Sequence, residues 1–381
     1  MDVASAAQFR AQAPVTRQWA YFDHAAVAPL PSPAARAIED WLRQASEAGD
    51  VHWPAWSRRI EELRQSAAAM VNANPDEIAL VPNTSVGIGL IAEGLSWQSG
   101  DNVVTAANEF PSNLYPWLNL AERGVETRRV EAVNGVVSLT SIEAAIDERT
   151  RIVSLSWVGY ASGYRIDPAA VGALCRRKGC LFFLDAIQGL GVFPLDVSSA
   201  EVDFFAADGH KWLLGPEGAG LLYVRRERLN NLRPLMIGWN STEQRGAFDD
   251  PTFRIRPTAA RYESGTLNTP GFLGLAASVD LLRAWGVGPQ SSLVAERVLQ
   301  VTDYAIERLR SAGAEILSPR VPGCESGIVV FRCGEQPAAD VRKQLLAAGI
   351  VVSCRGGGIR ISPHAYNTAE EIDRLIGALR T

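Results

Sequence analysis

Two polar residues stand at the ends of short apolar runs and could act together chemically. Residues 181–184 form one run, which leads into Asp185, and residues 202–207 form a second, mostly apolar run, which leads into the segment D-G-H-K ending on Lys211. Short apolar runs bounded by polar residues predict buried strands, and the carboxyl ends of such strands carry functional side chains in α/β sheets. We therefore expect Asp185 and Lys211 to face one site.

A lysine and an aspartate at adjacent strand ends are the groups that a pyridoxal 5′-phosphate (PLP) enzyme requires. The lysine amine can form a Schiff base with the cofactor aldehyde. The aspartate can pair with the pyridinium nitrogen, so that the ring stays protonated and accepts electrons. Taken alone, such residues are more often a surface lysine and a strand-end cap, so this interpretation depends on further matches along the chain.

Composition limits the classes of protein that need to be considered. The chain has 381 residues, which is long for a single core and predicts two domains. Hydrophobic residues make up 47%, charged residues 21%, and the mean hydropathy is near zero, as in ordinary globular proteins. A net charge of −5 and a pI near 5.6 argue against nucleic acid or an anionic membrane as partner. No apolar run approaches the roughly 18 residues of a membrane span, and no signal peptide is evident, so we expect a cytoplasmic protein.

Cysteine and histidine spacing argues against disulfides and metals. The five cysteines are an odd number without a C-x-x-C pair, which predicts a reducing compartment. The four histidines lie far apart in the sequence, without the spacing of a metal-binding motif, so no metal site is expected.

The first hundred residues predict helices and one candidate anion site. The elements expected there are an extended, proline-stopped arm over 21–31, a helix over 32–47, an aromatic loop over 51–56 and a helix over 57–71. A short apolar strand then leads into Thr84 and Ser85, which are expected to cap a helix over 86–95. Free N–H groups at the start of that helix would attract an anion, although an ordinary helix cap explains the two hydroxyl residues as well.

From residue 102 onward, predicted strands and helices alternate. Strands are expected at 102–105, 127–130, 152–157 and 181–184, with helices at 113–123, 141–146 and 168–178 between them, and an antiparallel strand at 221–224. This alternation predicts a mostly parallel sheet with helices on both faces. After an irregular stretch at 239–261, helices at 270–284 and 292–310 and strands at 326–332, 350–353 and 359–362 predict a small α+β domain.

Six motifs in order give the chain a family resemblance. They are Y-F-D-H-A-A-V-A-P-L-P at 21–31, N-T-S at 83–85, F-L-D-A-I-Q at 183–188, D-G-H-K-W-L-L-G-P at 208–216, E-S-G-T-L-N-T at 263–269 and R-I-S-P-H-A-Y-N-T at 360–368. With them the chain resembles class V PLP-dependent enzymes of fold type I, which include cysteine desulfurases, selenocysteine lyases, C–S lyases and isopenicillin N epimerase-like proteins. The resemblance covers nearly the whole chain.

The resemblance implies a fold and a domain division. The fold is an α/β PLP-transferase architecture, with a mostly parallel seven-stranded sheet in a large domain over 31–270. An N-terminal arm over 1–30 precedes it, and a small C-terminal α+β domain over 271–381 follows, on which the arm could pack. The resemblance also implies a homodimer with shared active sites.

The resemblance assigns roles to residues at matching positions. Lys211 matches the Schiff-base lysine and Asp185 the pyridinium partner, and the other expected cofactor contacts are Gln188 at the phenolic oxygen, Thr84, Ser85 and His210 at the phosphate, and Thr266 at the phosphate of the neighbouring subunit. Expected substrate contacts are Arg360, His24 and Tyr160. Arg360 would clamp the α-carboxylate, a task that suits the two-pronged geometry of guanidinium.

Three positions depart from the desulfurase pattern. Desulfurases carry a nucleophilic cysteine on a mobile loop before the carboxylate-binding arginine, whereas Cys354 lies in a short segment only six residues before Arg360. We therefore expect a structural role for Cys354. Phe110 stands where desulfurases stack a histidine on the cofactor, so stacking is kept while proton transfer by an imidazole is lost. Asp208 stands where a phosphate-binding hydroxyl is found, and we expect this carboxylate to turn away or pair elsewhere.

The expected activity is β-elimination from a sulfur- or selenium-containing amino acid, without a persulfide-forming cysteine. An aminotransferase or an amino-acid epimerase of the same family is the main alternative, because the same proton abstraction precedes all three outcomes. A non-catalytic binding protein of this fold is a more distant alternative, since it would have no need of Lys211 and Asp185 together. The sequence leaves the substrate and the choice between these reactions open.

Overall fold

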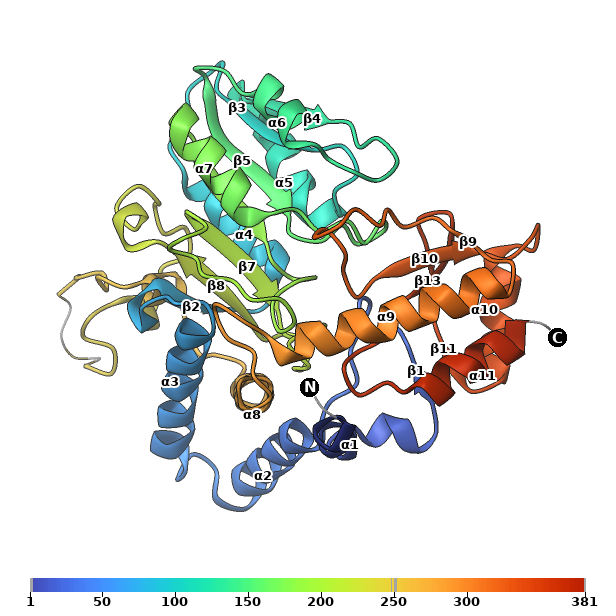
Figure 1. The fold of residues 1–381 in the computed structure, drawn as a ribbon. Helices are drawn as coiled ribbons and strands as arrows, with labels where there is room; N and C mark the ends of the chain where they lie inside the picture. The colour runs from blue at the N-terminus through green and yellow to red at the C-terminus, as the bar shows by residue number, and fades with distance from the viewer. Residues whose placement is uncertain (1–2, 248, 250–251, 380–381) are drawn as a thin grey trace.

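A seven-stranded sheet forms the centre of the larger part of the molecule, in a computed structural model that describes residues 3–247, 249 and 252–379 (Figure 1). Its strands are β2 (Ile78–Val81), β3 (Asn102–Ala106), β4 (Glu126–Val130), β5 (Thr150–Ser156), β6 (Leu181–Asp185), β7 (Phe204–Asp208) and β8 (Gly220–Val224). They lie in the order β2-β8-β7-β6-β5-β3-β4, and only β8 runs antiparallel to its neighbours. The predicted fold class, including the antiparallel strand at 221–224, is confirmed.

Both faces of this sheet are covered, which explains the apolar runs in the sequence. Successive side chains of a strand point to opposite faces. Phe182 and Leu184 of β6 belong to one buried cluster, whereas Phe183 belongs to another, and both clusters exclude solvent. A strand buried on both faces needs apolar residues at every position until its end, where Asp185 emerges.

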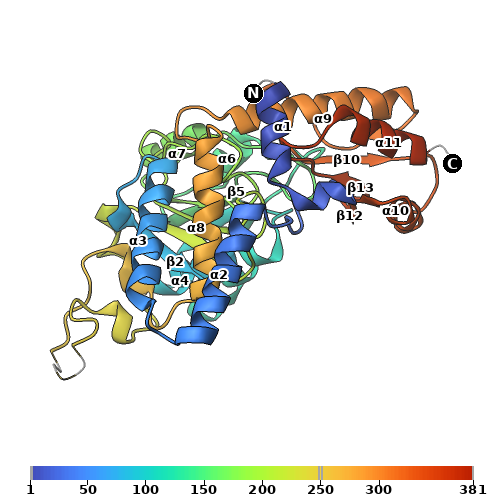
Figure 2. The same ribbon diagram turned by 90° about the horizontal axis from the view of Figure 1, so that it is seen from below.

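Helices provide the covering layers. They are α2 (Ser32–Ala48), α3 (Trp53–Met70), α4 (Thr84–Gly94), the short α5 (Tyr115–Leu118), α6 (Leu139–Ala145), α7 (Pro168–Lys178) and α8 (Thr269–Ala284). Figure 2 shows α8 between α2 and α3, and both pairs are in contact. None of the helices in the described residues has the length and apolar content needed to span a membrane.

Three local expectations were wrong. The aromatic loop expected at 51–56 instead contains the first turn of α3, where Pro54 is tolerated because the first helical N–H groups need no partner. The helix expected over 113–123 is broken into α5 and two flanking 3₁₀ turns, with Pro116 at the start of α5. The cap of α4 is Asn83, whose side chain accepts a hydrogen bond from Val86 N at 2.9 Å, rather than Thr84 or Ser85.

The C-terminal part of the chain forms a smaller unit. Strands β9 (Glu315–Ile316), β10 (Val329–Arg332), β12 (Ser353–Arg355) and β13 (Gly358–Ile361) form an antiparallel sheet in the order β12-β13-β10-β9. Helices α9 (Leu293–Ser311), α10 (Ala338–Ala347) and α11 (Ala369–Leu379) lie beside this sheet (Figure 1). In the N-terminal segment, which begins with α1 (Val3–Ala11), β1 (Ala20–Tyr21) pairs in parallel with β11 (Ile350–Val351). The arm therefore packs on the C-terminal unit.

The packing of α8 bears on the domain boundary that was expected at residue 270. Phe272, Leu275 and Val279 of α8 are buried, and α8 packs directly against α2 and α3 of the larger part of the molecule. Apolar side chains assign a helix to the core that they fill, whatever its place in the sequence. We therefore infer that the large domain extends to about Ala284.

A buried ion pair anchors the segment before α8. Arg64 of α3 donates from Nη1 to Glu263 Oε1 at 2.7 Å and from Nη2 to Oε2 at 3.2 Å, and both side chains are almost fully buried. Glu263 Oε1 also accepts from Leu80 N at 2.9 Å, and Arg64 donates to Ile78 O at 2.6 Å. The pair joins α3 and β2 to the motif that was expected to reach a neighbouring subunit.

Glu263→Gln is expected to lower the free energy of unfolding by about 3 kcal/mol, because the buried guanidinium of Arg64 loses its buried counter-charge and keeps only the partly exposed Glu61, at 3.0 Å from Nε. Urea denaturation of the purified variant measures this loss. Asp40→Asn, which breaks the exposed pair with Arg43, is the matched control and should change stability by less than about 1 kcal/mol. Equal stability of the Glu263 and Asp40 variants would contradict the anchoring role.

Candidate active site

A cavity of about 250 Å³ opens at the carboxyl ends of β6 and β7. Most residues predicted from the sequence line it, namely Thr84, Ser85, Phe110, Tyr160, Asp185, Gln188, Asp208, His210, Lys211 and Arg360. They come from segments far apart in the chain: the large sheet brings most of them to one edge, and β13 of the smaller sheet adds Arg360. This is the place where α/β sheets bind ligands.

Lys211 and Asp185 form the buried centre of the cavity. Asp185 is the last residue of β6, Lys211 lies three residues beyond β7, and each is less than 10% exposed. Burial lowers the pKa of Lys211 to about 8, an effect that the charge of Asp185 opposes. Burial raises the pKa of Asp185 to about 6. Two smaller effects lower this pKa, namely the hydrogen bond from Ile187 N to Oδ1 at 3.2 Å and the positive charge of Lys211. Near pH 7 the carboxylate is therefore mostly ionised, while the amine can lose its proton at little cost.

The start of α4 forms one end of the cavity. The first N–H groups of a helix have no partner within it, and together with the helix dipole they favour an anion. Thr84 Oγ1 accepts from Asp208 N at 2.9 Å, which leaves its own proton free to be donated. Ser85 Oγ donates to Ser112 Oγ at 2.7 Å.

Asp208 lies at this same end. Its Oδ2 is 3.0 Å from Nδ1 of His210, within ion-pair distance but without the alignment of a hydrogen bond. It still lines the cavity, however, rather than turning away from it.

The side-chain amide of Gln188 is held in one orientation. Its Oε1 accepts from Trp212 Nε1 at 2.8 Å, and its Nε2 donates to Ala25 O at 3.0 Å. An amide nitrogen carries two protons, so one donor of Gln188 is left for a ligand.

Phe110 covers the centre of the cavity. Its ring centroid is 5.5 Å from Lys211 Nζ and 5.1 Å from the ring of Tyr160, which it meets edge to face. Phe110 is 40% exposed, so one face of the ring is free to stack on a flat ligand.

Arg360 is pre-organised by three hydrogen bonds. It donates from Nη2 to Asp23 Oδ1 at 3.1 Å, from Nε to Ser353 Oγ at 3.1 Å and from Nη1 to the Tyr160 carbonyl at 3.0 Å. A guanidinium has five N–H donors, so one remains on each terminal nitrogen. Two such parallel donors match a carboxylate.

The sequence interpretation missed several residues around this site. Asp23 and Ser353 orient Arg360, and Ser353 Oγ also donates to Asp23 Oδ1 at 2.7 Å. Arg355 lines the cavity as a second guanidinium. Asp23 lies in the motif at 21–31, and Ser353 lies in the short segment before Arg360. Their closeness to these motifs was the only signal in the sequence that could have pointed to them.

Glu109 is a further residue that was missed. It accepts from Ser156 N at 2.7 Å and also from the Ser156 hydroxyl, and so ties the loop that carries Phe110 to the end of β5. Burial raises its pKa to about 7, although both bonds from Ser156 oppose the shift, while the charge of Asp185 adds to it. Glu109 therefore holds its proton near neutral pH more readily than an exposed glutamate.

His24 does not line the cavity, which corrects its expected contact with substrate. It is fully buried, and both ring nitrogens are engaged, Nδ1 with the Ser362 carbonyl at 2.8 Å and Nε2 with the Tyr366 hydroxyl at 2.6 Å. A carbonyl only accepts, so Nδ1 carries the proton and Nε2 accepts from the tyrosine. Burial lowers the pKa of His24 to about 4, so the ring is neutral and supports the segment rather than binding a ligand.

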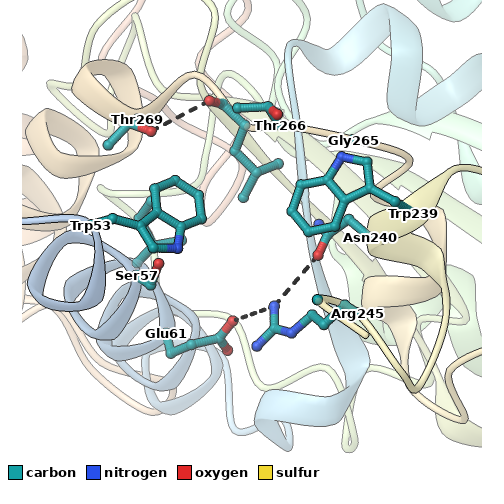
Figure 3. Close-up of a pocket in the computed structure, with 12 residues that line it drawn as sticks. Trp53, Ser57, Glu61, Trp239, Asn240, Arg245, Gly265, Thr266 and Thr269 are labelled. Atoms are coloured by element: carbon teal, nitrogen blue, oxygen red, sulfur yellow. Dashed lines mark hydrogen bonds and ion pairs between the residues drawn. The ribbon is translucent and has the colours of Figure 1, made fainter. Parts of the chain in front are cut away.

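Thr266 lies in a second, larger pocket of about 450 Å³ (Figure 3). Trp53 and Trp239 face each other across it, and Arg245 reaches Glu61 at 3.8 Å and Asn240 at 3.5 Å. Thr266 thus does not contact the cavity of its own chain.

Cys354 faces away from the cavity. Its neighbours in β12 point inward, since Ser353 contacts Arg360 and Arg355 lines the cavity. Side chains alternate along a strand, so Cys354 lies on the opposite face, where its thiol donates to Ala338 O of α10 at 3.3 Å.

Within the part of the chain that the structure describes, no cluster of three or more His, Cys, Asp or Glu residues could hold a metal ion.

Comparisons with known proteins match this architecture. A family model described as "Aminotransferase class-V" matches residues 20–375. A "Probable cysteine desulfurase" of Methanothermobacter thermautotrophicus is 33% identical, covering 96% of this chain and 95% of the relative. An "Uncharacterized aminotransferase YcbU" of Bacillus subtilis is 30% identical, covering 91% and 90%.

Solved structures agree along nearly the whole chain. A cysteine desulfurase from Thermococcus onnurineus, solved in its apo form, aligns with a TM-score of 0.88 and 26% identity, covering 97% of this chain and 96% of that one. A structure of the cystine C–S lyase C-DES with its reaction product cysteine persulfide aligns with a TM-score of 0.88 and 26% identity, covering 97% and 99%.

The ligand-free protein should show an unusually reactive Lys211 side chain. Below about pH 8 its amine is protonated and inert, and above that pH it is neutral and nucleophilic. Acetylation by acetic anhydride, followed by peptide mass spectrometry across a range of pH, should give a midpoint near 8 for Lys211, against about 10.4 for a lysine model peptide. Asp185→Asn should lower the midpoint further, because the charge that favours the ammonium form is removed. A midpoint at the model-peptide value would contradict this description of the site.

Proposed function

The chain belongs to the aminotransferase class-V family, and from this premise we propose that it is a PLP-dependent lyase that releases a β-substituent from a sulfur- or selenium-containing amino acid. The observation that carries the proposal is the convergence of Lys211, Asp185 and Arg360 on one buried cavity. A lysine, an aspartate and a carboxylate-binding arginine are the minimum that PLP chemistry on an amino acid demands.

The cavity fits the cofactor through groups that keep a donor, a charge or a ring face unused by their protein partners. The phosphate would lie at the start of α4, near Thr84, Ser85 and His210. Gln188 has one N–H left for the phenolic oxygen, and Phe110 presents a free ring face for stacking. Asp185 would face the ring nitrogen, and it is anionic above about pH 6.

Bound PLP supplies an electron-withdrawing ring that accepts the electron pair left when a substrate loses its α-proton. Arg360 holds the substrate carboxylate with its two remaining N–H donors and so fixes the Cα–H bond in space. Lys211, whose pKa is about 8, can take that proton and return it to a leaving group or carbon near neutral pH. Asp185 keeps negative charge next to the ring nitrogen while the electron pair is delocalised.

The position of Cys354 favours elimination over persulfide formation on the enzyme. A desulfurase thiol must reach the substrate sulfur and then carry it to an acceptor, which needs a mobile and exposed thiolate. Cys354 instead donates to the backbone of α10 from the outer face of β12. The sulfur would therefore leave with the product and would not be transferred to the protein.

Arg355 supports a substrate with an additional acidic group. Its guanidinium lines the cavity, and its nearby charge contributes to lowering the pKa of Lys211, although burial is the main cause. Cystine carries two amino-acid carboxylates, and it is the substrate named for the structurally similar C-DES. We propose cystine-like disulfide amino acids as the first substrates to test.

The test is a product assay of wild-type protein, Lys211→Ala and Cys354→Ser with cystine, cysteine and selenocysteine. Wild type and Cys354→Ser should release pyruvate and ammonia at equal rates, and Lys211→Ala should lose turnover while keeping its fold by circular dichroism. A keto acid that retains the substrate side chain would indicate an aminotransferase, and inverted substrate would indicate an epimerase. A persulfide on Cys354, with loss of activity in the serine variant, would show a desulfurase. Full activity of Lys211→Ala would overturn the catalytic assignment.

Thr266 and its pocket support a homodimer with shared sites. Trp239, which lines this pocket, lies in a stretch of chain with further exposed apolar side chains, and Met236, Ile237, Trp239 and Phe253 are each 40% or more exposed. Exposed apolar clusters of this kind mark association surfaces. A two-fold interface here would let Thr266 reach the phosphate in the cavity of the second copy.

The five unpaired cysteines support a reducing, cytoplasmic location.

Light scattering should give a mass twice the 41.2 kDa of one chain. Ile237→Glu should shift the protein toward monomer, because a charge would be buried in the interface. Leu346→Glu on α10, a similarly exposed leucine in the smaller unit, is the control and should leave the dimer intact. A wild-type monomer with full cofactor occupancy would rule out the shared site.

A further inference from the structure

We propose that Cys175 and Cys180 form an oxidisable dithiol, a modification site at the end of the sheet opposite the cavity. Cys175 lies in the last turn of α7, and Cys180 immediately precedes β6. Asp185 stands at the other end of that strand. The catalytic proposal leaves both cysteines without a role.

The local backbone brings the two cysteines together. Helix α7 ends at Gly179, whose φ of 74° is left-handed and suits glycine. Gly179 N donates to Arg176 O at 3.3 Å and Cys180 N to Cys175 O at 3.1 Å, which is the bond pattern of a Schellman motif. This motif places the side chains at its two ends in contact, and here both ends are cysteine.

The two cysteines contact each other directly. Cys180 Sγ donates to the Cys175 carbonyl at 3.7 Å, and both side chains line one cavity. A disulfide requires Cα atoms within about 7 Å and Cβ atoms that face each other. The Schellman turn brings the side chains of its two end residues together, so the second requirement is fulfilled before any movement of the backbone.

Exposure and the surrounding charges decide which sulfur reacts first. Cys180 is the more exposed of the two residues, at 7% against 1% for Cys175. Lys178 also favours the Cys180 thiolate, whereas burial and Asp203 oppose it. Cys180 is therefore the attacking group and Cys175 the resolving one.

A cavity gives small reagents a route to the pair. It has a volume of about 540 Å³ and is lined by both cysteines together with Arg176, Glu201, Asp203, Arg225 and Arg228. Cys180 is 7% exposed and Cys175 1%, so the thiols form the wall of the cavity and do not project into solvent. An oxidant therefore reaches the thiols of the folded protein through this cavity.

The oxidant class is a low-molecular-weight disulfide. The Cys180 thiolate attacks one sulfur of that disulfide, the S–S bond breaks, and one thiolate leaves. Cys175 then loses its proton to solvent, attacks the Cys180 sulfur and displaces the second thiolate. The protein gives up two electrons and two protons, and the reagent is reduced to two thiols.

Trypsin separates the two cysteines, which makes the product easy to identify. Cleavage after Arg165, Arg176, Arg177, Lys178 and Lys211 leaves Cys175 in peptide 166–176 and Cys180 in peptide 179–211. An intramolecular disulfide therefore joins two peptides that are otherwise separate.

The experiment incubates the native holoenzyme with glutathione disulfide, alkylates the remaining thiols with iodoacetamide in denaturant and maps the unreduced digest. We expect the joined peptide pair to form, two alkylatable thiols to be lost per chain, and both effects to reverse with a reductant. Cys354→Ser should behave as wild type, whereas Cys175→Ala and Cys180→Ala should give no joined pair. Since the dithiol lies outside the active cavity, both alanine variants should keep basal turnover.

Wild-type protein alone is enough to overturn the proposal, even if an alanine variant fails to fold. Retention of both thiols in the native protein, with cross-linking only after denaturation, would show that the pair is merely buried packing. A glutathione adduct that stays on Cys180 without resolution by Cys175 would equally exclude the dithiol.

Discussion

The burial of Lys211 beside Asp185 is the constraint on which the rest of the site depends. An amine and a carboxylate taken out of water shift their pKa values toward each other, to about 8 and about 6. That shift makes a lysine usable as a proton acceptor near neutral pH. Such pKa shifts require that water be excluded from both residues. The helices α4 and α8 cover the two faces of the sheet around β6 and β7, and the two polar residues lie at its carboxyl edge.

Arg360 shows how the separate parts of the chain become one site. Its partners come from the N-terminal arm (Asp23), the large domain (Tyr160) and the C-terminal unit (Ser353). A buried guanidinium is costly unless its donors are satisfied, so these three segments must meet correctly for the arginine to be held at all. The pairing of β1 with β11 places the arm where it can contribute its carboxylate.

The sequence by itself determined the fold class and the centre of the site. Doubly buried strands need uninterrupted apolar runs, and the polar residues that end those runs at the carboxyl edge are visible without a structure. For this reason Asp185, Lys211 and the alternation of strands and helices could be predicted. Motifs in order then identified Gln188 and Arg360, the departure from the desulfurase pattern identified Phe110, and the structure places all three in one cavity.

Only the tertiary structure decided which residues act through contacts distant in sequence. Asp23 accepts a hydrogen bond from Arg360, 337 residues further along the chain, and no local sequence pattern could predict that bond. His24, the next residue, was expected to bind substrate but is fully enclosed by Ser362 and Tyr366. The alternation of side chains in β12 places Cys354 on the outer face of that strand, and α8 packs against α2 and α3, which is the basis for our inference that it belongs to the large domain. Each of these outcomes depends on which surfaces meet in three dimensions, whereas sequence patterns report only local periodicity and burial.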